Sequence, residues 1–301
     1  MSSEGTPETA GAEEVWTVKK VLDWTIGHLK QHGSESPRLD AEILLAHARG
    51  CQRIQLYTQY DTELEPEERA AMRDLVRRRA TLEPVAYLVG FREFFGLDFE
   101  VEPGVLIPRP DTETLVVTAL EILNELPVPN VLDVCTGTGC IPVAIAANCE
   151  AATLTGIELD GQVQQIAQRN IEKHDLTGRI SLLQGDLFSP LSNDVSFDVI
   201  TSNPPYVTDE EMDTLQPDVR QHEPQLALRG GADGLDIVRR LIVESPTWLA
   251  DGGALLLEIG DQQSGAVTQL FADADKYEPA QIVKDLGGHS RVVWARKKST
   301  T

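Results

Sequence analysis

The sequence carries a short polar corner, Asn203-Pro204-Pro205-Tyr206, directly after FDVITS, an apolar segment that predicts a buried strand. Two successive prolines remove two backbone donors and fix φ, and a residue before proline is driven toward an extended conformation, so this corner is stiff. It offers an amide oxygen, backbone carbonyls and an aromatic ring in fixed positions, which together could hold a planar amino group. A purely structural turn would have the same composition, so the rest of the sequence has to distinguish the two.

A glycine-rich segment, NVLDVCTGTGCIPVAIAA, predicts a strand, a tight turn and a helix. Gly137 and Gly139 would let the backbone of this turn approach a ligand closely. The dinucleotide fingerprint G-x-G-x-x-G needs a third glycine where this chain has Pro142, and the lysine of a P-loop is absent. A nicotinamide cofactor and a nucleoside triphosphate are therefore both disfavoured.

Acidic residues end three successive predicted strands: Asp133, Glu158 and Asp186. A carboxylate about 20 residues after a glycine loop can accept hydrogen bonds from both ribose hydroxyls, which suits Glu158. Asp186 could accept the exocyclic amine of an adenine ring. The alternatives are a surface acid beside a turn for Glu158 and a helix cap for Asp186. Together with the glycine loop, the acids indicate an adenosyl ligand, and S-adenosylmethionine fits better than a triphosphate.

From residue 109 onward, apolar strands alternate with helical segments, which predicts an α/β fold with a doubly wound, mostly parallel sheet covered on both faces. The seven predicted strands are NVLDV, ATLTGIEL, RISLLQ, FDVITSN, GALLLEIG, AQIVKD and RVVWAR. Ligands bind outside the carboxyl ends of such strands, near the point where strand order reverses. We therefore expect the glycine loop, the acids and the corner to meet there.

The remaining sequence divides into three parts. Residues 1 to 14 are small, polar and acidic, which is typical of a disordered tail. Residues 15 to 89 have apolar side chains at helical spacing and predict a small helical domain. Residues 90 to 108 alternate aromatic and polar side chains around two glycines and predict a β-hairpin connector. Residues 109 to 301 then form the predicted α/β domain.

The composition restricts partners and compartment. With 26 Lys and Arg against 48 Asp and Glu, the formal net charge is −22, which disfavours direct nucleic-acid binding. The four cysteines include no CxxC pair and predict reduced thiols, with no disulfides and no metal site. No apolar run could span a bilayer and no secretory signal is evident, so we expect a cytoplasmic protein without membrane association.

One local cluster of basic residues departs from this acidic composition. Its members are Arg73, Arg77, Arg78 and Arg79, which share one predicted helix. The cluster is either a salt-bridged helix face or a docking patch for an acidic partner.

Two sets of motifs carry a resemblance to a known family. The pattern D-x-x-x-G-x-G, then Glu158, then NPPY resembles amino-methyltransferases that use S-adenosylmethionine. The stretches SPRLDAEILLAH, LIPRPDTETLV, LDVCTGTGCIPVAIA, SNPPYV and DVRQHEPQLAL resemble the bacterial release factor glutamine methyltransferases, from about residue 16 to the C-terminus. The resemblance implies a Rossmann-like methyltransferase fold, S-adenosylmethionine as cofactor, and class 1 peptide-chain release factors as substrates. The target is the glutamine of their Gly-Gly-Gln motif, and the helical domain is expected to dock the partner.

The resemblance also implies roles for individual residues. The expected cofactor-binding residues are Cys135, Thr136, Gly137, Thr138, Gly139, Glu158, Asp186, Leu187 and Asn203. The expected substrate-binding residues are Asn203, Pro204, Pro205 and Tyr206, of which Asn203, Pro204 and Tyr206 are catalytic. Residues 108 to 113 (PRPDTE) should border the active site, where Arg109 either fixes the loop or contacts the partner.

Cys135 departs from the family pattern, which often has glycine at this place. A positive φ would strain a cysteine. We therefore expect an ordinary backbone here, with the small side chain beside the methionine part of the cofactor.

A glutamine amide explains the NPPY corner. Its nitrogen is a poor nucleophile because the lone pair is delocalised into the carbonyl. The Asn203 side-chain oxygen and the Pro204 carbonyl can each accept one N–H bond, which aims the lone pair at the methyl carbon. Tyr206 offers a flat face for the amide, and no strong general base is needed because the extra proton can leave after transfer.

Two other functions are compatible with parts of this pattern. Enzymes that methylate the adenine amine of DNA use the same corner, but they should offer a basic groove, which a charge of −22 opposes. A catalytically inactive scaffold would have lost site residues, yet the acids and the corner are all present.

Overall fold

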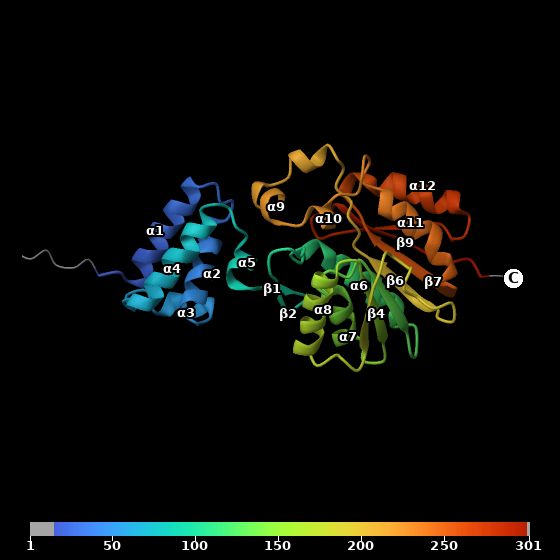
Figure 1. Cartoon of the computed structure of the whole chain (residues 1–301), viewed down its shortest axis with the longest axis horizontal. Coiled ribbons are helices and arrows are strands. Elements are labelled where there is room, and N and C mark those ends of the chain that lie inside the picture. The colour runs from blue at the N-terminus through green and yellow to red at the C-terminus, as the bar shows by residue number, and fades with distance from the viewer. Residues whose placement is uncertain (1–14, 300–301) are drawn as a thin grey trace, which may run out of the picture. The chain divides into compact units, whose positions relative to one another are not determined.

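The computed structural model describes residues 15 to 299 of the chain (Figure 1). The chain divides into two compact units at the junction between Val89 and Gly90. The acidic segment expected to form a tail, residues 1 to 14, lies outside the described residues. No helix among the described residues is long and apolar enough to cross a membrane.

The N-terminal unit is built of helices. They are α1 (Val18–Gln31), α2 (Pro37–Ala48), α3 (Arg53–Thr58), α4 (Pro66–Arg79) and α5 (Val85–Val89). Pro37 and Pro66 occupy first helical positions, where a missing N–H costs nothing. The core contains Val18, Leu29, Leu44, Leu45 and Leu56, all fully buried. A buried ion pair between Arg79 and Asp40 (2.8 Å) ties α4 to α2.

The second unit begins with the predicted hairpin, β1 (Phe91–Phe94) and β2 (Leu97–Glu100). Phe95 and Gly96 both have positive φ at its two-residue turn, which matches the twist of the two strands. Phe94 and Phe99 are buried in the core of this unit. The hairpin therefore packs as part of the α/β unit.

A mixed sheet of seven strands in the order β5-β4-β3-β6-β7-β9-β8 forms the centre of this unit. The strands are β3 (Asn130–Val134), β4 (Thr153–Glu158), β5 (Ile180–Gln184), β6 (Phe197–Ser202), β7 (Leu249–Glu258), β8 (Gln281–Lys284) and β9 (Ser290–Arg296). Neighbours from β5 to β7 pair in parallel, and β9 pairs antiparallel with both β7 and β8. The order of the strands reverses between β3 and β6, which confirms the predicted doubly wound, mostly parallel sheet.

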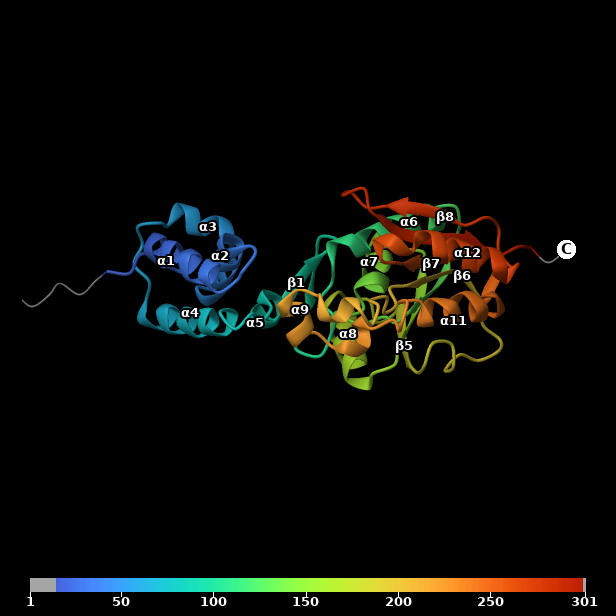
Figure 2. The same ribbon diagram turned by 90° about the horizontal axis from the view of Figure 1, so that it is seen from above.

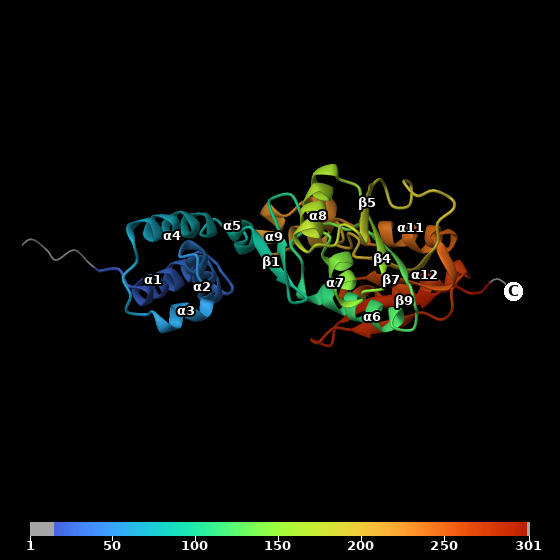
Figure 3. The same cartoon turned by 90° about the horizontal axis from the view of Figure 1, so that it is seen from below.

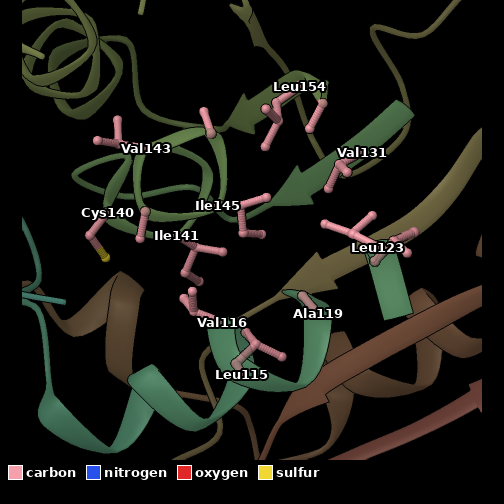
Figure 4. Close-up of a cluster of buried hydrophobic side chains, with 14 of the residues drawn as sticks. Leu115, Val116, Ala119, Leu123, Val131, Cys140, Ile141, Val143, Ile145 and Leu154 are labelled. Carbon is pink, nitrogen blue, oxygen red and sulfur yellow. The ribbon is translucent and has the colours of Figure 1, made fainter. Parts of the chain in front are cut away.

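Helices cover both faces of the sheet. One layer contains α6 (Glu113–Leu123), α7 (Cys140–Asn148) and α8 (Gly161–Lys173), and the other contains α11 (Asp236–Glu244) and α12 (Ser264–Ala274). Figure 2 views the unit from the side of α11 and α12, and Figure 3 views it from the side of α6 and α7. Alternate residues of β3 face the two layers: Val131 belongs to the buried cluster that also contains Leu123 and Ile145, as Figure 4 shows, whereas Leu132 belongs to the cluster that contains Val238.

Shorter elements complete the unit. They are α9 (Pro217–His222), α10 (Gln225–Leu228), η1 (Pro110–Thr112), η2 (Glu211–Asp213), η3 (Ser245–Thr247) and η4 (Asp261–Gln263). Of these, η1 and η4 contact the NPPY corner directly through side chains.

Candidate active site

The reversal of strand order brings the two polar motifs together. Val134, the last residue of β3, pairs with Ser202, the last residue of β6, and the Ser202 hydroxyl donates to the Val134 carbonyl (2.7 Å). The glycine loop and the NPPY corner therefore leave the sheet side by side. One cavity is lined by seven of the expected site residues: Cys135, Gly137, Glu158, Asp186, Leu187, Asn203 and Pro205.

Other expected residues do not line this cavity. Thr136, Thr138 and Gly139 turn the chain into α7, and the two threonines are buried. Pro204 and Tyr206 belong to the corner but are absent from the cavity wall. Residues that the sequence analysis did not select, including Leu106 and Leu226, form part of the wall instead.

The glycine loop has left-handed backbone at alternate positions. Gly137 and Gly139 have φ of 56° and 78°, and Cys135 has φ of 62°. The expectation of an ordinary backbone at Cys135 is therefore wrong. The chain must turn sharply while Thr136 N donates to Ile157 O (3.0 Å), and this turn forces position 135 into a conformation that costs a non-glycine residue about 1–2 kcal/mol.

The Cys135 side chain is a neutral thiol. Burial and the nearby Glu158 carboxylate raise the pKa of Cys135 to about 12. The thiolate form is thus disfavoured, and Cys135 has no role as a nucleophile at neutral pH.

Asp133 supports the loop from behind and does not line the cavity. The carboxylate is fully buried and accepts hydrogen bonds from the hydroxyls of Thr136 (2.5 Å) and Thr201 (2.7 Å). Burial raises the pKa of Asp133 to about 7, with the Glu158 charge adding to the effect. Asp133 therefore braces the turn between β3 and α7.

This raised pKa predicts a measurable effect on stability. In the unfolded chain Asp133 ionises near the ordinary aspartate pKa of 3.8, whereas the folded protein favours the protonated carboxyl up to about pH 7. The stabilisation from this group is therefore lost progressively as pH rises from about 4 to 7, at up to about 1.4 kcal/mol per pH unit, and changes no further once the folded protein is also ionised above pH 7. Melting curves of the wild type and Asp133→Asn between pH 4.5 and 8.5 should show the variant gaining stability relative to the wild type up to about pH 7, with a constant difference above it. A pH-independent difference would contradict this role.

Glu158, at the end of β4, is fixed by backbone amides. Its Oε1 accepts from Leu159 N (2.9 Å) and Asp160 N (3.1 Å), and its Oε2 accepts from Gly137 N (2.9 Å). An ionised carboxylate has about four acceptor positions, so acceptor capacity remains on the cavity side. The carboxylate both orients the loop and offers an acceptor to hydroxyl groups.

Asp186 has a partner that the sequence did not reveal. Both of its carboxylate oxygens lie near Arg240 Nη1 of α11, at 3.0 and 3.1 Å. The Asp186 side chain remains about half exposed. Leu187, the next residue, has φ of 48°, so the chain also turns sharply here.

The NPPY corner is held from several sides. Asn203 Nδ2 donates to Thr112 Oγ1 (3.2 Å), and the Tyr206 hydroxyl donates to Glu258 Oε1 (3.3 Å). The Gln263 side chain donates to the Tyr206 carbonyl (2.9 Å). A Cβ atom at Gly234 would lie 2.2 Å from the same carbonyl, so only glycine fits there.

The PRPDTE loop is fixed by ion pairs. Arg109 Nη2 lies 2.5 Å from Glu223 Oε1, and Glu223 Oε2 accepts from Ile107 N (3.3 Å). Arg291 pairs with Asp111 (2.9 Å). Of the two roles considered for Arg109, this geometry assigns it to fixing the loop.

Two family models and several curated proteins match this chain. Residues 20–90 match the family model of the PrmC N-terminal domain, and residues 111–230 match that of the methyltransferase small domain. A protein of Rhodopirellula baltica is 46% identical over 94% of this chain and 97% of its own length, and one of Geobacter sulfurreducens is 44% identical over 94% and 98%. Both are named release factor glutamine methyltransferase.

A solved structure shares the fold. The catalytic domain of hMettl16, in complex with an RNA hairpin of the MAT2A 3'UTR, has a TM-score of 0.57 over 76% of this chain and 83% of that chain. At 17% identity this likeness concerns the fold alone.

Proposed function

The chain belongs to the release factor glutamine methyltransferase family, and from that premise we propose that it methylates the glutamine of the Gly-Gly-Gln motif in class 1 peptide-chain release factors. The methyl group of S-adenosylmethionine is transferred to the side-chain amide nitrogen, and the product acts in translation termination. The observation that carries this proposal is the NPPY corner beside a cavity whose wall includes Glu158 and Asp186.

The residues of the cavity fit S-adenosylmethionine. Glu158 would accept the ribose hydroxyls, Asp186 and the backbone at Leu187 would bind the adenine, and the loop from Cys135 to Gly139 would take the methionine part. A Cβ at Gly137 would meet nothing within 4 Å, so this loop leaves open space next to the fixed Glu158 carboxylate. When bound, the cofactor supplies an electrophilic methyl group on a sulfonium.

The corner orients the substrate amide and does not abstract a proton from it. Because Asn203 Nδ2 is bonded to Thr112, its Oδ1 is the atom left to accept an N–H of the substrate amide. The Pro204 carbonyl would accept the second N–H. Burial, with the Glu258 carboxylate adding to it, raises the pKa of the Tyr206 phenol, so Tyr206 stays protonated and serves as a neutral surface for the amide.

We assign substrate docking to the helical unit. A groove between α1 and α4 is lined by aromatic and cationic side chains, among them Trp16, Trp24, His28, Arg69 and Arg73. Trp24 is 52% exposed and stacks on His28, with ring centroids 4.8 Å apart. In a chain of net charge −22 this groove fits an acidic surface of the release factor. Arg77 also lines the groove and pairs with Asp74. Arg78 and Arg79 lie outside it and pair with Glu83 and Asp40.

Charge reversal tests the docking role. Arg69→Glu with Arg73→Glu should lower kcat/KM for an intact release factor about tenfold at low salt, and the loss should shrink as salt screens the contact. Turnover of a short Gly-Gly-Gln peptide should not change. The control is Lys19→Glu with Lys30→Glu, which makes the same charge change at two exposed α1 residues outside the groove. Equal losses of kcat/KM in the two double variants would show that the groove does not dock the release factor.

A competition assay separates this function from DNA methylation. With labelled S-adenosylmethionine, we expect label in a release factor and none in duplex DNA offered in the same reaction. Label in the DNA would reverse the assignment.

A further inference from the structure

A buried polar chain lies behind the NPPY corner and is not explained by binding alone. Glu258, at the end of β7, is fully buried, and Thr112 in η1 is 2% exposed. Asn203 Nδ2 donates to Thr112 Oγ1 (3.2 Å), and the Tyr206 hydroxyl donates to Glu258 Oε1 (3.3 Å). The corner is thus held at Asn203 by a hydroxyl and at Tyr206 by a carboxylate, and these two groups come from distant parts of the sequence.

The direction of these hydrogen bonds follows from what each group can donate. A threonine hydroxyl that accepts from Asn203 has one hydrogen left to give. Within the described chain, Glu258 Oε2 is buried without a partner of standard hydrogen-bond geometry, and the Thr112 hydroxyl is close enough to favour the ionised carboxylate. Since a carboxylate only accepts, the chain runs from Asn203 to Thr112 to Glu258, and Tyr206 donates to Glu258 from the other side.

This direction matters because an asparagine amide has two nearly isosteric ends. With Nδ2 on Thr112, Oδ1 faces the substrate and accepts an N–H. Rotated by 180°, the side chain would direct an NH₂ group at the NH₂ group of the substrate glutamine. The rotated form would also take the Thr112 hydrogen and leave the buried Glu258 carboxylate without it, which is costly.

We propose that Glu258, acting through Thr112, is a positioning residue that holds the Asn203 amide with its oxygen toward the substrate nitrogen. This inference rests on the proposed function and adds to it a residue that never touches the substrate.

The surroundings of Glu258 predict how this device depends on pH. Glu258 faces Tyr206 from the corner, Thr112 and Asp111 from η1, Arg291 from β9 and the Cys140 thiol from α7. Burial raises the pKa of Glu258 to about 7, against the opposing effects of Thr112 and Arg291. Above pH 7 the ionised carboxylate accepts from the Tyr206 hydroxyl and favours a Thr112 hydroxyl whose hydrogen is directed toward it. Below pH 7 Glu258 is protonated and needs an acceptor for its own hydrogen, so it no longer favours the Thr112 hydrogen. The orientation of the Asn203 amide is then less well fixed, and turnover should fall.

The first test compares isosteric changes at buried threonines. Thr112→Val should lower kcat for methylation about tenfold and leave S-adenosylmethionine affinity within about twofold of wild type. Thr112→Ser keeps the hydroxyl and should restore most of that loss. The control, Thr118→Val, removes another buried hydroxyl that donates to the Thr114 carbonyl (2.8 Å) on α6 and has no bond to the corner. A folded Thr112→Val protein with wild-type kcat would overturn the proposal.

The second test changes the carboxylate. Glu258→Gln can donate toward Thr112 and reverse the chain, so it should lower kcat and abolish the fall in activity below about pH 7. An unchanged pH profile in a folded Glu258→Gln protein would contradict the proposal. If this variant does not fold, the kcat values of Thr112→Val and Thr112→Ser test the proposal without it.

A spectroscopic reading separates this inference from the proposed function. In protein labelled with ¹⁵N-asparagine, the side-chain NH₂ signals of Asn203 are identified by their loss in Asn203→Asp. They should move with pH near 7 in the wild type and in Thr118→Val, and stay fixed in Thr112→Val. Asn203 signals that are identical in all three proteins would overturn the proposal. A wild type that methylates no release factor would instead refute the function and leave this measurement valid.

Discussion

Replacing Asn203 by alanine should lower the turnover of release factor methylation by at least about 100-fold, the usual cost of losing one preorganised polar group aimed at the reacting atoms. The substitution removes the side-chain oxygen that would fix one N–H of the substrate amide, so the loss should lie in kcat. Affinity for S-adenosylmethionine, measured by titration calorimetry, should change by only a few-fold.

The control for this variant is Asn148→Ala. Asn148 caps the end of α7 by donating to the Ala144 carbonyl (2.9 Å), far along the chain from the corner. It should lose a little stability and keep its turnover. Near-normal turnover in a folded Asn203→Ala protein would show that the corner does not orient the amide.

Glu158→Ala should weaken S-adenosylmethionine binding by at least about tenfold, because hydrogen bonds to a charged carboxylate contribute about 1.5–3 kcal/mol each. Two effects add: the ribose hydroxyls lose their acceptor, and Gly137 N loses the oxygen that fixes it at 2.9 Å. Titration calorimetry measures the loss directly.

Glu158→Gln separates these two effects. It keeps one acceptor oxygen and the volume of the side chain, so its loss of affinity should be smaller than that of the alanine variant. If both variants bind S-adenosylmethionine as tightly as the wild type, the cavity has been matched to the wrong ligand.

The arrangement of the site follows from the topology of the sheet, which the sequence predicts. Strand and helix alternation predicts a parallel sheet, and the reversal of strand order places the residues after Val134 next to those after Ser202. For that reason Gly137, Glu158 and Asn203 could be expected in one cavity from the sequence alone.

The sequence-based predictions were wrong or incomplete where contacts between distant parts of the chain determine the structure. The backbone of Cys135 is fixed by the bond between Thr136 N and Ile157 O, and no local pattern encodes a bond to a neighbouring strand. Thr112 and Glu258 are 146 residues apart and meet only in the fold, so their joint support of the corner has no signature in sequence spacing. Likewise, Arg240 reaches Asp186 from α11 across 54 positions.

The most direct test is to identify the methylated atom. The full-length protein is incubated with labelled S-adenosylmethionine and class 1 release factors, and the labelled residue is located by peptide mass mapping. We predict a single added methyl group on the glutamine of the Gly-Gly-Gln motif, and none when that glutamine is replaced by glutamate. A methyl group on any other residue, or undiminished labelling of the glutamate variant, would contradict the account.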